Sequence, residues 1–280
     1  MASFKISRIA APCSARRHGA SCIAFEASIG TVEAAKPIAV ARRLYHAKWV
    51  QFTQLAVAGL VWFLLHAAVA GTALRGWLIA RFGEKTYRTG FSLASLGSLW
   101  WLVQEYRQAP FVVLWGVPAP LYFVPVALVP LAFVLLVGAF TVPSPTALGG
   151  EKLLASPDAA RGMLRVTRHP FLWSVVLWSC AHLLVNADVS SFVFFGSLGL
   201  TALRGTSDID RKRRRSSPTD YARFEASTSN VPLGAIVTGR NRLLIRELWL
   251  PILLGLAVAL GAIALHPRFF GAPALPRIRG

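Results

Sequence analysis

The sequence predicts an all-α protein, a polytopic membrane bundle of about six transmembrane helices. First, 55% of its 280 residues are hydrophobic and its mean hydropathy is +0.53, which excludes a disordered chain and is unusual for a soluble domain. Second, apolar runs of about 17–25 residues, the length that crosses a bilayer, recur along the chain. Third, lysine and arginine lie in the gaps between those runs, as they do in multi-pass membrane proteins.

The formal net charge of +18 raises nucleic acid as a partner. Because the basic residues lie between apolar runs and not on one soluble face, we predict a lipid bilayer as the partner and no nucleic acid. The cysteines Cys13, Cys22 and Cys180 form no CxxC pair and no disulfide framework. The compartment therefore cannot be inferred from them.

Residues 1–48 differ in composition from the rest of the chain. They are rich in serine and alanine and carry eight basic residues against Glu26 and Glu33. This resembles a targeting segment, but no apolar stretch with a cleavage site follows; we favour the alternative, an upstream start codon read into a bacterial gene. We expect a poorly ordered extension over 1–48, a transmembrane domain over 49–270 and a short tail over 271–280.

Six apolar segments follow the extension. Four prolines punctuate the third segment and the residues before it, so we expect that helix to be kinked or broken. Pro170 opens the fourth segment, at a position that a helix tolerates, and residues 186–188 form a tight turn into the fifth. The predicted spans are 49–71, 89–103, 122–140, 170–187, 189–203 and 248–265.

Basic residues are abundant in the gaps after the first, third and fifth spans and sparse after the second and fourth. By the positive-inside rule the rich gaps are cytoplasmic, and both ends of the domain face outward. We interpret the basic run at residues 211–215 as a solvated cytoplasmic anchor that also meets anionic lipid. The sequence contains no internal repeat.

Two histidines, His66 and His182, lie inside predicted spans. An ionisable side chain within a membrane is costly and is by default a functional candidate. For each histidine we weigh a metal ligand or proton carrier against a structural imidazole hydrogen-bonded to a neighbouring helix. His182 lies nearer the middle of its span, so a ligand role is favoured there most.

A second candidate site is the pair Arg168 and His169, directly before Pro170. Arginine and histidine at a membrane surface are suited to an anionic cofactor or substrate group; the alternative is a helix end that meets water or lipid headgroups. His169 and His182 are thirteen residues apart, which places them on different faces of one helix at about 100° per residue. Cys180 is expected to be a packed core thiol.

The residues resemble one family, the NnrU proteins. The resemblance covers nearly everything from the first predicted span to the tail and leaves out residues 1–48. Its combined pattern is specific, whereas the TRHP motif alone is not. The segments that carry it are LLHAAVAGTALRGWLIARFGEKTYRTGFSLAS (64–95), TRHPFLWSVVLWSCAHLL (167–184), a basic run followed by DYARFEASTSNVPLGAIVTGR (220–240), and HPRFFG (266–271).

The resemblance implies a multi-pass protein of the bacterial inner (cytoplasmic) membrane that is tied to denitrification and nitric-oxide metabolism, with partners in nitrite or nitric-oxide reduction. Plant and cyanobacterial relatives of the family include 15-cis-zeta-carotene isomerase, a membrane enzyme that uses haem b. Its two haem histidines match His66 and His182, so the resemblance implies haem b held by these two residues. Arg168 and His169 would pair with the haem propionates or another anion.

The resemblance leaves the reaction open between a redox protein and a haem-dependent isomerase that acts on a lipophilic small molecule. The isomerase has a cysteine three residues before its second histidine, which can replace that histidine on the iron. This chain has Ser179 at that position and Cys180 one place later. A ligand exchange of that kind is therefore not expected here.

Two other functions stay open. The segment TRHPF, with Tyr221 and Pro232 downstream, also resembles isoprenylcysteine and phospholipid methyltransferases, which bind S-adenosylmethionine through an Arg-His-Pro motif. Their acidic pair is only loosely echoed by Asp208 and Asp210, and alternating carboxylates in a loop are weak evidence for a metal site. The second function is thus methyl transfer at the membrane surface. The third is a non-catalytic membrane component that assists assembly or transport.

Overall fold

The computed structural model describes residues 35–147, 149–156, 158–271 and 273–275. The extension predicted to be poorly ordered lies mostly in residues 1–34, outside the described residues. The chain divides into two compact units, Met1–Arg43 and Leu44–Gly280. The described part of the first unit is the beginning of helix α1.

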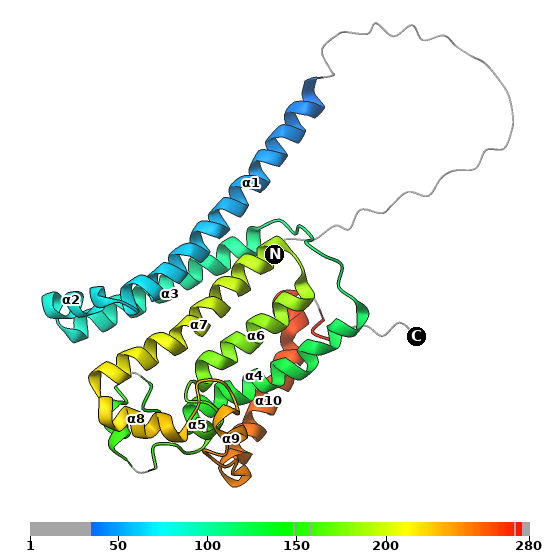
Figure 1. Ribbon diagram of the computed structural model, residues 1–280. Helices are drawn as coiled ribbons and strands as arrows, with labels where there is room; N and C mark the ends of the chain where they lie inside the picture. The colour runs from blue at the N-terminus through cyan, green and yellow to red at the C-terminus, as the bar shows by residue number, and fades with distance from the viewer. Residues whose placement is uncertain (1–34, 148, 157, 272, 276–280) are drawn as a thin grey trace, which may run out of the picture. The chain divides into compact units, whose positions relative to one another are not determined.

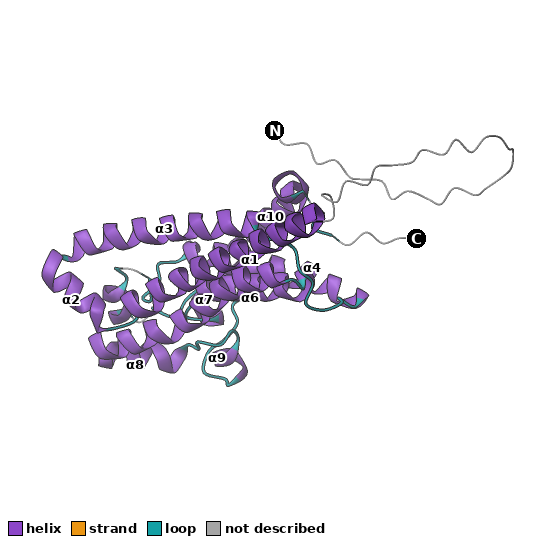
Figure 2. Ribbon diagram, turned by 90° about the horizontal axis from the view of Figure 1, so that it is seen from above, coloured by secondary structure: helices purple, strands orange, loops and turns teal. Residues whose placement is uncertain are grey.

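The described residues confirm the all-α prediction, since their regular structure is helical apart from one isolated β-bridge between Val113 and Asp188 (Figures 1 and 2). The longer helices are α1 Ala35–Leu64, α2 Ala73–Phe82, α3 Glu84–Gln108, α4 Val124–Thr141, α6 Pro170–Asn186, α7 Val189–Ser216, α8 Pro218–Ser227 and α10 Ile245–Phe270. Shorter segments are the π-helix η1 Leu65–Ala70, the 3₁₀ turns η2 Ala119–Phe123 and η3 Glu151–Ala155, and the single turns α5 Met163–Val166 and α9 Gly234–Val237.

In this part of the chain, three segments are long and apolar enough to cross a membrane: Trp49–Ala70, Ala119–Thr141 and Ile245–Phe270. Helix α6 is apolar but has only 17 residues. Helices α3 and α7 contain the other two predicted spans, but serine, threonine and glycine dilute their apolar runs. The structure thus supports a membrane protein with three candidate spans, and the count of six stays a prediction.

Several predicted boundaries are corrected. The fifth span was expected to end at residue 203, but α7 continues to Ser216 and makes the basic run helical. The extension has a buried face on which Thr206, Asp210 and Arg213 contact other parts of the chain. Three arginines in its last turn also interact favourably with the helix dipole. The third helix was expected to be kinked or broken; it is not broken at Pro130, which lies inside α4, and the kink stays a prediction. The predicted turn is confirmed: Ala187 has a left-handed φ of 51°, and the Asp188 side chain accepts a hydrogen bond from the Ser191 amide at 3.0 Å.

Four helices pack in the order α10, α4, α6 and α7 (Figure 1). Small residues let the helices approach closely, as is common between membrane helices. A Cβ added at Gly255 of α10 would lie 2.5 Å from the Cα of Val134 in α4, and one at Gly199 of α7 would lie 3.0 Å from the Cβ of Ser179 in α6. Helix α10 therefore contacts α4 at Gly255, and α7 contacts α6 at Gly199.

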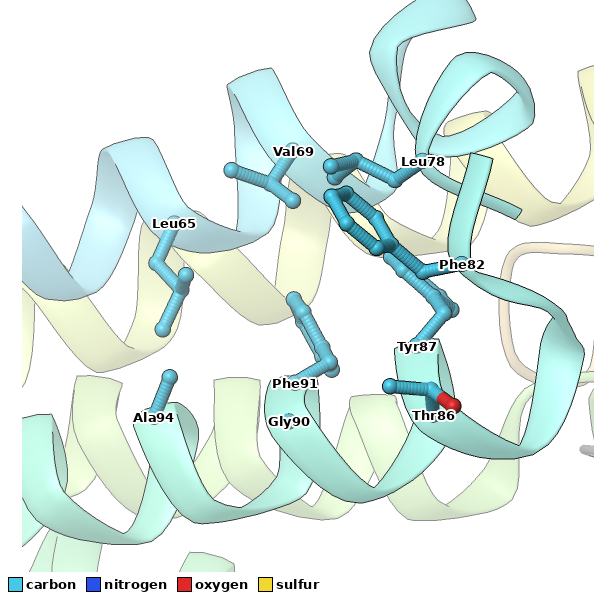
Figure 3. Close-up of a pocket in the computed structure, with 9 residues that line it drawn as sticks. All are labelled: Leu65, Val69, Leu78, Phe82, Thr86, Tyr87, Gly90, Phe91 and Ala94. Carbon is cyan, nitrogen blue, oxygen red and sulfur yellow. The ribbon is translucent and has the colours of Figure 1, made fainter. Parts of the chain in front are cut away.

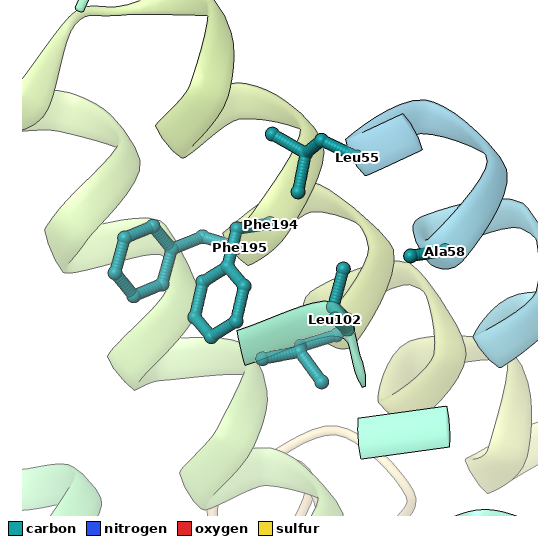
Figure 4. Close-up of a cluster of buried hydrophobic side chains, with 6 residues drawn as sticks. Leu55, Ala58, Leu102, Phe194 and Phe195 are labelled. Carbon is teal, nitrogen blue, oxygen red and sulfur yellow. The ribbon is translucent and has the colours of Figure 1, made fainter. Parts of the chain in front are cut away.

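The hydrophobic core cluster consists of buried residues from α1, α3 and α7 (Figure 4). Trp62 of α1 and Trp178 of α6 pack against it. The two spans with internal histidines therefore meet the same apolar cluster. Its buried members are Leu55, Ala58, Leu102, Phe194, Phe195 and Leu198.

Candidate functional site

His66 and His182 have the same local hydrogen-bond geometry. In each, ring atom Nδ1 lies 2.8 Å from the backbone carbonyl oxygen of the tryptophan four residues earlier, Trp62 or Trp178. A carbonyl only accepts, so Nδ1 carries the proton and Nε2 keeps its lone pair. Neither Nε2 atom makes a hydrogen bond with the described residues, and neither is sealed away completely. A metal-binding histidine commonly has this arrangement, with one ring nitrogen tied to a carbonyl and the other free.

Aromatic side chains pack against both imidazole rings. The His66 ring lies 4.2 Å from the Trp62 ring and 5.4 Å from that of Phe91, centroid to centroid. The His182 ring lies 4.8 Å from Trp178 and stacks on Phe195 at 4.7 Å. No direct contact joins the two imidazoles among the described residues; the shared core cluster links them through their tryptophans.

His66 lies in the π-helix η1, a conformation that is rare and frequent at functional sites. Beside it is an apolar cavity of about 250 Å³ between η1, α2 and α3 (Figure 3). Phe91 both lines this cavity and contacts the His66 ring. The space next to the histidine is therefore apolar and bounded by aromatic side chains.

Arg168 and His169 lie in a different place, at the start of α6, and both contact Asp210 of α7. The Arg168 guanidinium donates to both Asp210 carboxylate oxygens, at 3.0 to 3.2 Å, and to Glu225 Oε1 at 2.9 Å. His169 Nε2 donates to Asp210 Oδ1 at 2.6 Å, and the Tyr221 hydroxyl donates to the same oxygen. The buried network thus joins α6, α7 and α8.

Neighbouring loops complete this network. Asn230 donates to Thr206 Oγ1 at 3.0 Å, and its backbone carbonyl accepts from the Thr167 hydroxyl at 2.6 Å. Arg240 donates to the backbone carbonyls at the end of α8, where a cation is favourable. The site is therefore tied together by both side chains and backbone.

The side chains at the centre of the network are almost completely buried. Side-chain exposure is 6% for Arg168, 1% for His169 and 4% for Asp210. Removing one partner of a buried ion pair strongly destabilises the folded protein, because the other charge is left uncompensated. His169 Nδ1 is buried without a hydrogen-bond partner in the described part of the chain.

Burial by itself would raise the pKa of Asp210. The hydrogen bonds that Asp210 accepts from His169, Arg168 and Tyr221 outweigh burial and hold the pKa of Asp210 well below its ordinary value near 4. For Tyr221, burial and the adjacent Asp210 carboxylate raise the pKa, so its hydroxyl remains a donor. Asp210 is therefore a carboxylate that accepts from four side chains, those of Arg168, His169, Tyr221 and, at 3.5 Å, Asn230.

This shift predicts a pH dependence. A carboxyl group whose pKa is lower in the folded protein contributes stability above its ordinary pKa, and loses it as pH falls toward the folded value. We expect the difference in unfolding free energy between the wild type and Asp210→Asn to be full at pH 7 and to shrink below pH about 4. Denaturant titration of both proteins in detergent micelles, repeated at several pH values, measures this difference. A difference that grows on acidification would contradict the assignment.

The structure also corrects three interpretations of the sequence. Asp208 and Asp210 are expected in a loop but lie in helix α7, and Asp210 is the centre of the network. Cys180 was expected to be a core thiol and is exposed, whereas Ser179 is buried. The basic run is not uniformly solvated: Arg213 is buried and donates to Glu151 and to the Ala147 carbonyl. One available signal was periodicity, since Ala202, Thr206, Asp210 and Arg213 share one buried face of α7.

Comparison with known proteins identifies a family and a relative. The NnrU protein family model matches residues 54–274. Over 118 residues the chain is 34% identical to 15-cis-zeta-carotene isomerase, chloroplastic, from Arabidopsis thaliana, a match that covers 40% of this chain and 31% of that protein. The chain thus matches less than a third of the length of that curated relative. No solved structure matches.

Proposed function

Because this chain belongs to the NnrU protein family, we propose that it is a membrane protein that binds haem b through His66 and His182. Its chemistry would be redox chemistry tied to nitric oxide or denitrification, or isomerisation of a lipophilic substrate. The finding that carries the proposal is the matching geometry of the two histidines. Each has Nδ1 committed to a carbonyl at 2.8 Å and Nε2 left free.

The residues present suit this cofactor chemically. Haem iron is commonly held by imidazole nitrogen, and bound haem would supply an iron that changes oxidation state. The carbonyls of Trp62 and Trp178 select the tautomer that leaves Nε2 unprotonated, and they orient each ring. Stacking on Phe195 restricts rotation of the His182 ring. The apolar cavity beside His66 would admit a lipophilic molecule and exclude water.

Arg168 and His169 remain proposed partners of the haem propionates or another anion. In this role they would have to exchange contacts with Asp210 and Glu225 for the new anion. We also propose a bacterial inner-membrane location and partners in nitrite or nitric-oxide reduction. The three candidate spans support the membrane part of this proposal.

The test is a visible spectrum of the detergent-purified protein after expression with ample haem. We expect a Soret band, and we expect haem occupancy to fall about tenfold or more in His66→Ala and in His182→Ala. His46→Ala, outside the residues that the family model matches, is the control and should retain the band. Folded protein without a Soret band, or full occupancy in both variants, would refute haem binding.

Methyl transfer is the second candidate, and one contact favours it: Asp210, one of the two residues that loosely echo the acidic pair of the methyltransferases, binds both Arg168 and His169. Calorimetry with millimolar S-adenosylmethionine distinguishes the two functions, since heat of binding without a Soret band would favour methyl transfer. If cells carrying both histidine substitutions keep wild-type function, a non-catalytic role in assembly or transport is favoured instead.

A further inference from the structure

A second cavity, of about 360 Å³, lies between the beginning of α2 and the last turns of α7. One wall is formed by the turn that follows η1, with Thr72 and Arg75. The opposite wall carries Arg211, Lys212 and Arg215. Neither the two histidines nor Asp210 line it, and four of its eleven lining residues are cations: Arg75, Arg211, Lys212 and Arg215.

The cavity has surplus positive charge. Its one carboxylate, Asp208, is already paired with Arg204 and Arg211, each at 3.2 Å. Neither Lys212 nor Arg215 has a carboxylate within ion-pair distance in the described part of the chain. The pKa of Lys212 is lowered by burial and by repulsion from Arg75 and Arg213. Arg75 pairs with Glu84 at 4.0 Å and Arg211 pairs with Asp208, so Lys212 and Arg215 are the lining cations without an ion-pair partner among the described residues.

Helical periodicity in α7 selects which members of the basic run line the cavity. Arg211 and Arg215 are four residues apart and share a face. Arg213 points instead to Glu151 and Arg214 to Glu225, where each has its own acidic partner. Two members of the basic run at residues 211–215, Arg213 and Arg214, therefore form ion pairs with acidic residues elsewhere in the fold. The other three, Arg211, Lys212 and Arg215, line the cavity.

Gly71 allows the two walls to approach. A Cβ at this position would lie 2.6 Å from the Ala67 carbonyl oxygen and 2.7 Å from Asp208 Oδ2. The Thr72 hydroxyl then caps α2 by accepting from the Leu74 amide at 3.2 Å. Glycine thus places the N-terminal end of α2, with Arg75 in its first turn, against the basic face of α7.

The cavity lies where a lipid headgroup would be found. The candidate span Trp49–Ala70 ends at its edge, and basic residues beside a span are expected on the cytoplasmic side. Leu74 and Trp77 of α2, which flank the lining residues Arg75 and Gly76 in the sequence, are exposed apolar side chains. Basic pockets between membrane helices at this level bind phosphate-bearing headgroups.

We propose that this cavity is a binding site for a phosphate group. The cations Arg75, Lys212 and Arg215 would donate to the phosphate oxygens, as charge-assisted hydrogen bonds favour. The phosphate arrives on an anionic phospholipid or as a free anion, and the experiment separates these sources. The site does not depend on haem.

The test titrates purified protein in neutral detergent with phosphatidylglycerol, phosphatidylcholine and inorganic phosphate, followed by native mass spectrometry. The variant Lys212→Gln/Arg215→Gln should bind phosphatidylglycerol about tenfold more weakly than the wild type. Arg242→Gln/Arg246→Gln removes the same charge from exposed positions elsewhere and should change binding less than about twofold. Lys212→Arg/Arg215→Lys keeps the charge and should keep binding, which separates charge from misfolding.

Each outcome bears on the proposal. Saturable phosphatidylglycerol binding that phosphate does not compete away identifies the lipid as the source, whereas competition by phosphate shows that the phosphate group suffices. The proposal is overturned if neither ligand binds saturably, if phosphatidylcholine binds equally well, or if both glutamine double variants weaken binding to the same extent.

Discussion

Replacing Asp210 by asparagine is expected to lower the free energy of unfolding by about 3–5 kcal/mol. The carboxylate accepts from Arg168, His169 and Tyr221. Asparagine has nearly the same size but lacks the negative charge, and its amide nitrogen cannot accept a hydrogen bond. Among the described residues, Arg168 would keep only the partly exposed Glu225 as an acidic partner.

Denaturant titration of the purified protein, followed by tryptophan fluorescence, measures this loss. Asp220→Asn is the matched control, because Asp220 is 40% exposed and pairs only with the exposed Arg223; its loss should cost at most about 1 kcal/mol. Equal effects of the two substitutions would show that the buried network does not hold the fold together.

Gly255→Ala is expected to destabilise the protein by about 1–3 kcal/mol. The added Cβ would lie 2.5 Å from the Cα and 2.8 Å from the amide nitrogen of Val134. Both are backbone atoms, so no side-chain rotation relieves the overlap and α10 must move away from α4. Close contact between these helices depends on the missing Cβ.

The same helix provides the control for this prediction. A Cβ at Gly261 has no heavy atom within 4 Å, and alanine favours a helix more than glycine does. Gly261→Ala should therefore be neutral or slightly stabilising in the same unfolding measurement, opposite in sign to Gly255→Ala. A destabilisation of the same size at both positions would mean that the α4–α10 contact is not the cause.

The two candidate sites share α6 and α7 but differ in chemistry. His182 of α6 stacks on Phe195 in the first half of α7, among apolar side chains. His169, directly before α6, contacts Asp210 in the second half of α7, among charges. The polar network therefore clamps the same pair of helices that positions the His182 ring.

Much of the helical content was predictable from the residues alone. Apolar runs in a membrane must satisfy their backbone hydrogen bonds internally, and a helix does this within one segment. The turn at Ala187 and the start of α6 at Pro170 were likewise local, because each depends on neighbouring residues. His66 and His182 were found because imidazoles are rare in such apolar segments.

The polar site could not be predicted in the same way. Arg168 and Asp210 are 42 residues apart, and nothing local to either indicates that they meet. The length of α7 was missed for a related reason, because Thr206, Asp210 and Arg213 look like a soluble loop until their partners are known. Composition and periodicity determine which segments become helices, whereas the pairing of buried charges depends on how α6, α7 and α8 come together, and only the folded chain contains that information.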